Sequence, residues 1–96
     1  MINRFKLRDA ADRDFDVSVT WYEEHSAVVA GRFIKEVQEH LDRIMQFPHG
    51  FNPIGKGLRQ CVLKRFPFVV VYRITDRTCH ILAIFHTSRN PLTKLS

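Results

Sequence analysis

A chain of 96 residues can bury one small hydrophobic core and has no room for a second domain. With 45% hydrophobic and 26% charged residues, its composition excludes a disordered chain and is typical of an ordinary soluble globule. Fifteen Lys and Arg against ten Asp and Glu give a formal net charge of +5, which favours nucleic acid, an acidic protein or an anionic surface as the partner.

The sequence carries no sign of export, of a membrane span or of a metal site. Residues 1–9 are charged and lack the apolar core of a signal peptide. No run approaches the ~18 apolar residues that a membrane-spanning helix requires. Cys61 and Cys79 lie within apolar runs, as buried free thiols do in a reducing compartment. We therefore expect a cytoplasmic protein with no membrane partner, no metal and no other cofactor.

The first quarter of the chain predicts a short strand followed by a helix. Residues 2–7 alternate loosely between apolar and polar side chains, as in an edge or leading strand. Asp9 is the expected N-cap of the helix, where a negative charge suits the helix dipole. Trp21 lies at the edge of its apolar stripe. That stripe recurs at helical spacing and consists of Ala11, Phe15, Val19 and Tyr22.

A second helix follows, with Ser26 as its expected N-cap and Pro48 ending it. Gly31 costs about 1 kcal/mol relative to alanine in mid-helix, so we expect it to permit a close helix crossing. Residues 49–57 are predicted to be a loop, and the two helices an antiparallel hairpin. The apolar face consists of Ala30, Phe33, Ile34, Val37, Leu41, Ile44 and Met45. The polar face consists of Arg32, Lys35, Glu36, Glu39 and Asp42.

The last third predicts three strands, at residues 58–63, 68–74 and 79–85. Pro67 separates the first two, and a polar turn at residues 75–78 joins the last two as a hairpin. The middle run, FVVVY, is apolar on both faces, which predicts a central strand covered on both sides. The predicted order of elements is therefore β-α-α-β-β-β.

Cations and one histidine lie at the ends of these strands. Such a sheet end is typical of a platform for an anionic partner. Lys64 and Arg65, beside a turn, also fit the simpler role of solvated charges. The full set is Arg59, Lys64, Arg65, His86 and Arg89.

The other members of this set also fit structural roles. The ring of His86 could bind a backbone carbonyl, and Arg59 could pair with a helix carboxylate such as Asp14. Arg89 could lock the end of the chain onto the sheet. Three further histidines lie at predicted polar or loop positions and are assigned no function: His25, His40 and His49.

The order and spacing of short motifs over nearly the whole chain resemble the RelE/ParE superfamily, the toxins of type II toxin–antitoxin systems. The helical motifs are Ala10-Ala11-x-x-Asp14-Phe15, Trp21-Tyr22, Ala30-x-x-Phe33 and Leu41-x-x-Ile44 followed by Pro48. The more specific motifs come from the sheet and are Gly57-Leu58-Arg59, the stretch 66–73 (FPFVVVYR) and His86-x-x-Arg89-x-Pro91.

The resemblance implies a microbial RNase-like α+β fold, in which a helical hairpin packs on one face of a twisted antiparallel sheet. It also implies one of two activities. RelE-like toxins cleave messenger RNA on the ribosome, whereas ParE-like toxins poison DNA gyrase without being nucleases. In both branches a small antitoxin wraps and neutralises the toxin.

The choice between the branches depends on catalytic groups. Metal-free RNA cleavage needs a base, an acid and a cation that holds the phosphorane. In a RelE-like enzyme His86 would be the acid or base, with Arg59 and Arg65 holding phosphate. RelE-like nucleases commonly add an aromatic residue near the C-terminus, often tyrosine, and no tyrosine follows Tyr72 here. The ending that begins at His86 looks more like that of ParE-type toxins.

We therefore favour a toxin that poisons DNA gyrase, with a ribosome-dependent endoribonuclease as the alternative and a non-toxic basic binding module as the third. The expected partners are a cognate, acidic antitoxin and either gyrase or the ribosome with its messenger RNA. The isolated chain is also expected to self-associate, as a homodimer, through the surface that the antitoxin covers. The residues expected to bind the target are Arg59, Lys64, Arg65 and Arg89.

Overall fold

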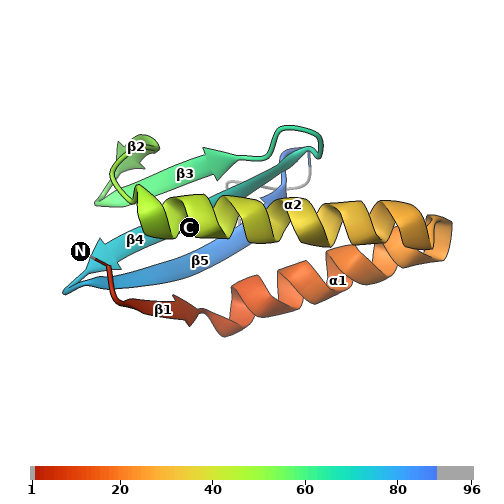
Figure 1. The fold of residues 1–96 in the computed structure, drawn as a ribbon, viewed down its shortest axis with the longest axis horizontal. Coiled ribbons are helices and arrows are strands. Elements are labelled where there is room, and N and C mark those ends of the chain that lie inside the picture. The colour runs from red at the N-terminus through yellow and green to blue at the C-terminus, as the bar shows by residue number, and fades with distance from the viewer. Residues whose placement is uncertain (1, 89–96) are drawn as a thin grey trace.

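Two helices cover one face of a five-stranded sheet in the computed structural model, which describes residues 2–88 (Figure 1). The sheet order is β1-β5-β4-β3-β2. The α+β class and the predicted succession of two helices and three C-terminal strands are confirmed. In chain order the elements are β1 (Arg4–Leu7), α1 (Asp9–His25), α2 (Ala27–Gln46), β2 (Asn52–Gly55), β3 (Leu58–Val62), β4 (Phe68–Thr75) and β5 (Thr78–His86).

The sheet differs from the prediction at both of its edges. Residues 49–57, expected to be a loop, contain the short edge strand β2, which pairs antiparallel with β3. Gly55, Lys56 and Gly57 all have positive φ, and this left-handed backbone turns the chain back onto β3. Pro53 is tolerated in β2 because an edge strand can leave one side unpaired. At the other edge β1 lies parallel to β5, so the sheet is mixed rather than antiparallel. A parallel pair needs a long connection, which both helices and three strands supply here.

The helix boundaries follow the capping residues closely. Asp9 is the first residue of α1 rather than its cap, because Arg8 occupies the N-cap position and its side chain makes no capping bond. Ser26 alone separates α1 from α2, and its Oγ accepts a hydrogen bond from the N–H of Val29 at 3.3 Å, as predicted. Helix α2 ends at Gln46, two residues before Pro48.

The main core lies between the helical hairpin and the sheet. Both predicted apolar stripes face it. Gly31, by contrast, does not mark a helix crossing: it is exposed, and a Cβ there would meet no atom within 4 Å. Nothing in the packing explains a glycine at this position. The largest fully buried side chains are Tyr72, Phe33, Phe68, Ile44, Ile81, Ile84, Val37, Val70, Val71, Cys61 and Cys79.

Strand β4 is buried on both faces, as the run FVVVY predicted. Phe68, Val70 and Tyr72 belong to the main core. The alternate residues form a second, smaller cluster on the opposite face of the sheet, which contains Val69, Val71, Ala83 and Phe85, with Leu58 packed against it. The centre of the sheet is therefore a rigid base on which the residues at the strand ends are held.

Both cysteines are buried free thiols, as expected. Burial raises the pKa of the Cys79 thiol to about 11. Burial also raises the pKa of Cys61 to about 11, although the positive charge of Arg43 partly opposes this. The thiols lie on β3 and β5, with β4 between them. Within residues 2–88, neither helix is apolar enough over a sufficient length to cross a membrane.

Candidate functional site

The predicted strand-end residues separate into two groups along β4. His86 is the last residue of β5 and pairs with Phe68, the first residue of β4. Lys64 and Arg65 lie in the turn between β3 and β4. A backbone hydrogen bond of 2.8 Å from Thr87 to the carbonyl of Pro67 in that turn holds the end of β5 beside it. The structure therefore brings His86, Lys64 and Arg65 to the same end of the sheet.

Arg59 lies opposite the middle of β4, apart from this group. It pairs with Tyr72, four residues along β4 from Phe68, which corresponds to about 13 Å at the usual rise of a strand. Its Nη1 donates hydrogen bonds to the carbonyls of Phe51 at 2.7 Å and His49 at 3.3 Å. These acceptors are backbone carbonyls of the segment after α2, not a helix carboxylate such as the expected Asp14. Arg59 is thereby used to fasten this segment to the sheet.

Tyr72 supports the same contact. Its hydroxyl donates to the carbonyl of Pro48 at 2.6 Å. Burial raises the pKa of Tyr72 to about 12, while the positive charge of Arg59 acts in the opposite direction. The phenol therefore stays protonated at neutral pH and keeps its hydrogen bond.

His86 is half-buried, with its ring edge-on to Phe68 at a centroid distance of 5.2 Å. The backbone N–H of Ser88 donates to its Nδ1 at 3.1 Å, so the proton of the neutral ring is on Nε2. The predicted contact of the ring with a backbone carbonyl stays a prediction. Arg89, the remaining predicted residue, lies outside the described residues, as does Pro91.

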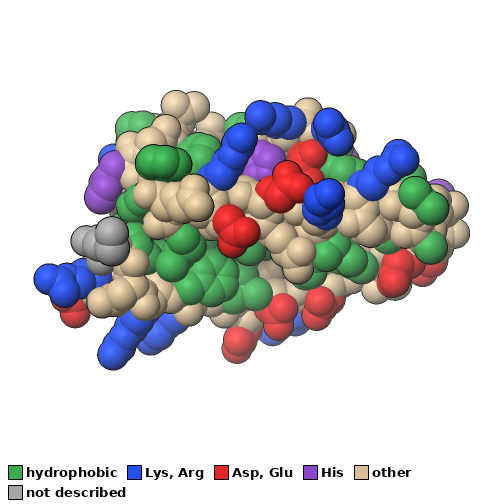
Figure 2. Space-filling model, viewed as in Figure 1, with side chains coloured by type: hydrophobic (Ala, Val, Ile, Leu, Met, Phe, Trp, Pro, Cys, Tyr) green, Lys and Arg blue, Asp and Glu red, His purple; other side chains and the backbone are tan. Residues whose placement is uncertain are grey.

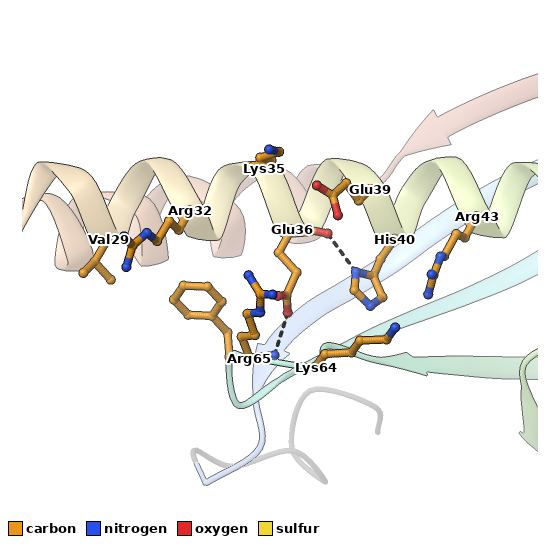
Figure 3. Close-up of a pocket in the computed structure, with 10 residues that line it drawn as sticks. Val29, Arg32, Lys35, Glu36, Glu39, His40, Arg43, Lys64 and Arg65 are labelled. Atoms are coloured by element: carbon orange, nitrogen blue, oxygen red, sulfur yellow. Dashed lines mark hydrogen bonds between the residues drawn. The ribbon is translucent and has the colours of Figure 1, made fainter.

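A groove with a volume of about 720 Å³ lies between α2 and the β3–β4 turn (residues 63–67) (Figure 3). Figure 2 shows Lys and Arg side chains gathered over this part of the surface, with acidic side chains among them. We call it the α2 groove. Its lining residues are Val29, Arg32, Lys35, Glu36, Glu39, His40, Arg43, Lys64, Arg65 and Phe66.

Two polar residues of α2 are buried in this groove, contrary to their predicted exposure. Glu36 is only 9% exposed, and its Oε2 accepts a hydrogen bond from the backbone N–H of Arg65 at 3.0 Å. His40 is 5% exposed, and its Nδ1 bonds the carbonyl of Glu36 at 2.8 Å. Both are buried because the β3–β4 turn folds over this side of α2. The carboxylate of Glu36 thus holds the turn that carries Lys64 and Arg65 against the helix (Figure 3).

Four of the polar residues that line this groove have a regular spacing in the sequence of α2. The polar residues Arg32, Glu36, His40 and Arg43 recur at intervals of four, four and three residues, which places them on one side of α2. The same spacing defines an apolar core stripe. Polar residues at this spacing usually form the solvent-exposed face of a helix, and here the β3–β4 turn lies against part of that face.

Among residues 2–88, no group of three or more His, Cys, Asp or Glu side chains is arranged to hold a metal ion. A smaller cavity of about 230 Å³ lies beside Arg59 and is lined in part by Pro53, Gly55, Gly57 and Leu58. Because Arg59 is bonded to the neighbouring carbonyls, this cavity offers fewer free polar groups than the α2 groove.

Comparison with known proteins identifies the family. The sequence model described as "ParE toxin of type II toxin-antitoxin system, parDE" matches residues 5–91. Toxin ParE2 of Mycobacterium tuberculosis, in two strains, is 30% identical over 92 residues, which cover 95% of this chain and 88% of the relative. A solved chain of the "Chromosomal ParDE TA system from P. aeruginosa" has the same fold, with a TM-score of 0.77 at 21% identity, covering 88% of this chain and 96% of that one. The match over most of its length shows that this chain belongs to the ParE toxin family of type II toxin–antitoxin systems.

Proposed function

We propose that this toxin arrests bacterial growth by binding and poisoning DNA gyrase, without catalysis of its own. Membership of the ParE family, over residues 5–91, is the observation that carries the proposal. The geometry of the candidate catalytic residues agrees with it. Arg59 lies about 13 Å along β4 from the level of His86 and is bonded to backbone carbonyls, so it is poorly placed to hold a phosphate that His86 would act on.

Neutralisation by a cognate antitoxin is the second part of the proposal. The net charge of +5 favours an acidic partner. The toxin also leaves apolar side chains for a partner to cover, since Val17 and Trp21, one turn apart on α1, are 66% and 45% exposed. Without the antitoxin, such a surface favours self-association of the toxin, for which a homodimer is the simplest form.

Inducible expression in a bacterial host tests both parts together. Growth should stop with DNA damage and filamentation, while the synthesis of protein continues at first. Co-expression of the protein encoded by the neighbouring reading frame should restore growth. Arrest with an immediate loss of translation, or growth that is unaffected by the toxin, would contradict the proposal.

A ribosome-dependent endoribonuclease remains the second candidate, because His86, Lys64 and Arg65 lie at the same end of the sheet. An imidazole beside two cations is a plausible acid–base group for RNA cleavage. This alternative predicts that His86→Ala removes toxicity while the protein remains folded, and that messenger RNA is cut within minutes of induction. Full toxicity of that variant would exclude it.

A further inference from the structure

The α2 groove gathers five cations around one hollow. Three come from α2 and two from the β3–β4 turn: Arg32, Lys35, Arg43, Lys64 and Arg65. Within the described residues 2–88, none of these side chains forms an ion pair. The described part of the lining contains two carboxylates, Glu36 and Glu39, against these five cations, so it has an excess of positive charge. Like charges held this close repel one another, and an anion in the groove would relieve that repulsion.

His40 adds a buried polar atom to this groove. Its Nδ1 bonds a carbonyl oxygen, which can only accept, so the proton is on Nδ1. Its Nε2 has no hydrogen-bond partner in the described part of the chain, although the side chain is only 5% exposed. Nε2 is nevertheless accessible to solvent. In the described part of the chain, every fully buried side-chain nitrogen or oxygen has a hydrogen-bond partner, and Nε2 has none. Figure 3 shows the ring pointing from α2 toward Lys64.

The shape and lining of the groove favour a phosphate backbone over a peptide. Arg32 and Arg43 are eleven residues apart on α2, which is about 16 Å along the helix axis. That length matches the axial rise of about five phosphates in one strand of a duplex. Among residues 2–88, only Val29 and Phe66 supply apolar side chains to the lining, whereas a docked peptide helix or strand needs apolar anchors. A phosphate backbone needs cations alone.

We propose that the α2 groove binds the phosphodiester backbone of DNA, with Arg43, Lys64 and Arg65 as its contacts. The choice of DNA rests on the proposed function, since gyrase acts on DNA: a toxin that grips the DNA as well as the enzyme would hold the two together. RNA has the same backbone chemistry, so the two nucleic acids must be distinguished by experiment.

The test measures binding of a 20-base-pair DNA duplex by fluorescence anisotropy, in the absence of gyrase, between 50 and 200 mM salt. The groove variant is Arg43→Gln with Lys64→Gln. The matched control is Arg4→Gln with Lys6→Gln, which removes the same charge from exposed residues of β1, the far edge of the sheet. Each phosphate contact contributes about −0.9 to the slope of log K against log salt. The groove variant should therefore lose about 2 units of slope, while the control keeps the wild-type slope.

A second readout reports on the groove itself. The imidazole resonances of His40 should shift when DNA is added at constant pH, because the ring lines the groove that the DNA would occupy. The control variant should show the same response, and the groove variant should show little of it.

Several results would overturn the inference. Equal losses of slope in both variants would mean that binding follows net charge and has no site. Unchanged His40 resonances would place the DNA elsewhere. Tighter binding of an RNA duplex of the same sequence would replace DNA by RNA. Retained DNA affinity in the groove variant, with lost affinity for polyglutamate, would assign the groove to an acidic peptide. None of these results depends on gyrase, so each of them would reject this inference and leave the proposed function standing.

Discussion

Arg59 and Tyr72 face each other across β3 and β4, and both side chains bind carbonyls of the segment that follows α2. The hydroxyl of Tyr72 donates a hydrogen bond to the carbonyl of Pro48 at 2.6 Å. The Nη1 of Arg59 donates to the carbonyls of Phe51 at 2.7 Å and His49 at 3.3 Å. Together they attach the end of the helical hairpin to the centre of the sheet. The contacts of Arg59 are therefore structural, because they stabilise the packing of this segment on the sheet.

Replacing Arg59 by alanine should act on stability first. The variant loses two hydrogen bonds from a charged donor, so we expect the free energy of unfolding in urea to fall by roughly 1.5–3 kcal/mol. Arg73→Ala is the control, because Arg73 is an exposed cation on the adjoining strand, and it should change stability by less than about 0.5 kcal/mol. An Arg59→Ala protein as stable as the wild type but no longer toxic would show that Arg59 acts directly on the target.

Glu36 should be the carboxylate of α2 on which stability depends most. Its removal by Glu36→Ala leaves the N–H of Arg65 without its acceptor, which should cost about 1–3 kcal/mol of unfolding free energy. Glu36→Gln keeps an acceptor oxygen and should cost less. The exposed neighbour Glu39 provides the comparison, and Glu39→Ala should be close to neutral. Equal effects at the two positions would contradict the burial of Glu36.

Stability should fall in alkaline solution. The pKa values of Cys61 and Cys79 rise from 9.0 to about 11 in the folded protein, and that of Tyr72 rises from 10.0 to about 12. Above pH 9 the unfolded chain releases these protons while the folded chain retains them, so ionisation favours unfolding. The contribution is complete below pH 9 and is lost as the pH rises toward 11–12. Urea unfolding at pH 8, 9.5 and 10.5 measures it, and a constant free energy over this range would contradict the burial of all three groups.

The same raised pKa values predict unreactive thiols. The thiolate is the reactive form, and both thiols are buried. At pH 8 the native protein should therefore react with iodoacetamide far more slowly than the protein in 8 M urea. Rapid alkylation of Cys61 or Cys79 in the native protein would mean that the strand concerned opens readily.

His86→Ala should keep its toxicity. A gyrase poison needs no acid or base from this residue, although the variant loses the bond from Ser88 and the ring contact with Phe68. We expect a modest loss of stability and growth arrest as strong as that of the wild type at a temperature where both are folded. His86→Gln, which retains polar capacity, serves as the comparison. Loss of toxicity in both folded variants would favour the RNA-cleaving alternative.

The helices and the three C-terminal strands could be predicted because their apolar side chains recur in the pattern typical of a helix or of a buried strand. The stripe from Ala11 to Tyr22 has helical spacing, and the continuous run of β4 indicates burial on both faces. Strand β2 could not be predicted, because its four residues, NPIG, show no alternation and include Pro53 and Gly55. The pairing of β2 with β3 depends on the turn at Lys56, and the sequence does not predict the positive φ of that residue.

The site residues were harder to place for a different reason. The sequence predicted a single platform of strand-end residues, whereas the structure brings Lys64, Arg65 and His86 to one end of the sheet and places Arg59 about 13 Å away along β4. It could not show that the partners of Arg59 are backbone carbonyls, since any segment can supply a carbonyl. Nor could it show that the β3–β4 turn buries Glu36, because that burial depends on a contact 29 residues away along the chain.

The central claim is that this ParE-family toxin poisons gyrase, and a gyrase assay with purified components tests it most directly. Supercoiling of relaxed plasmid by gyrase from the host species should be inhibited by the toxin, with cleaved DNA accumulating in covalent complexes, and prior addition of the antitoxin should prevent both effects. Heat-denatured toxin is the control for non-specific inhibition by a basic protein. Supercoiling that proceeds at the uninhibited rate in excess folded toxin, with no cleaved DNA, would contradict the claim.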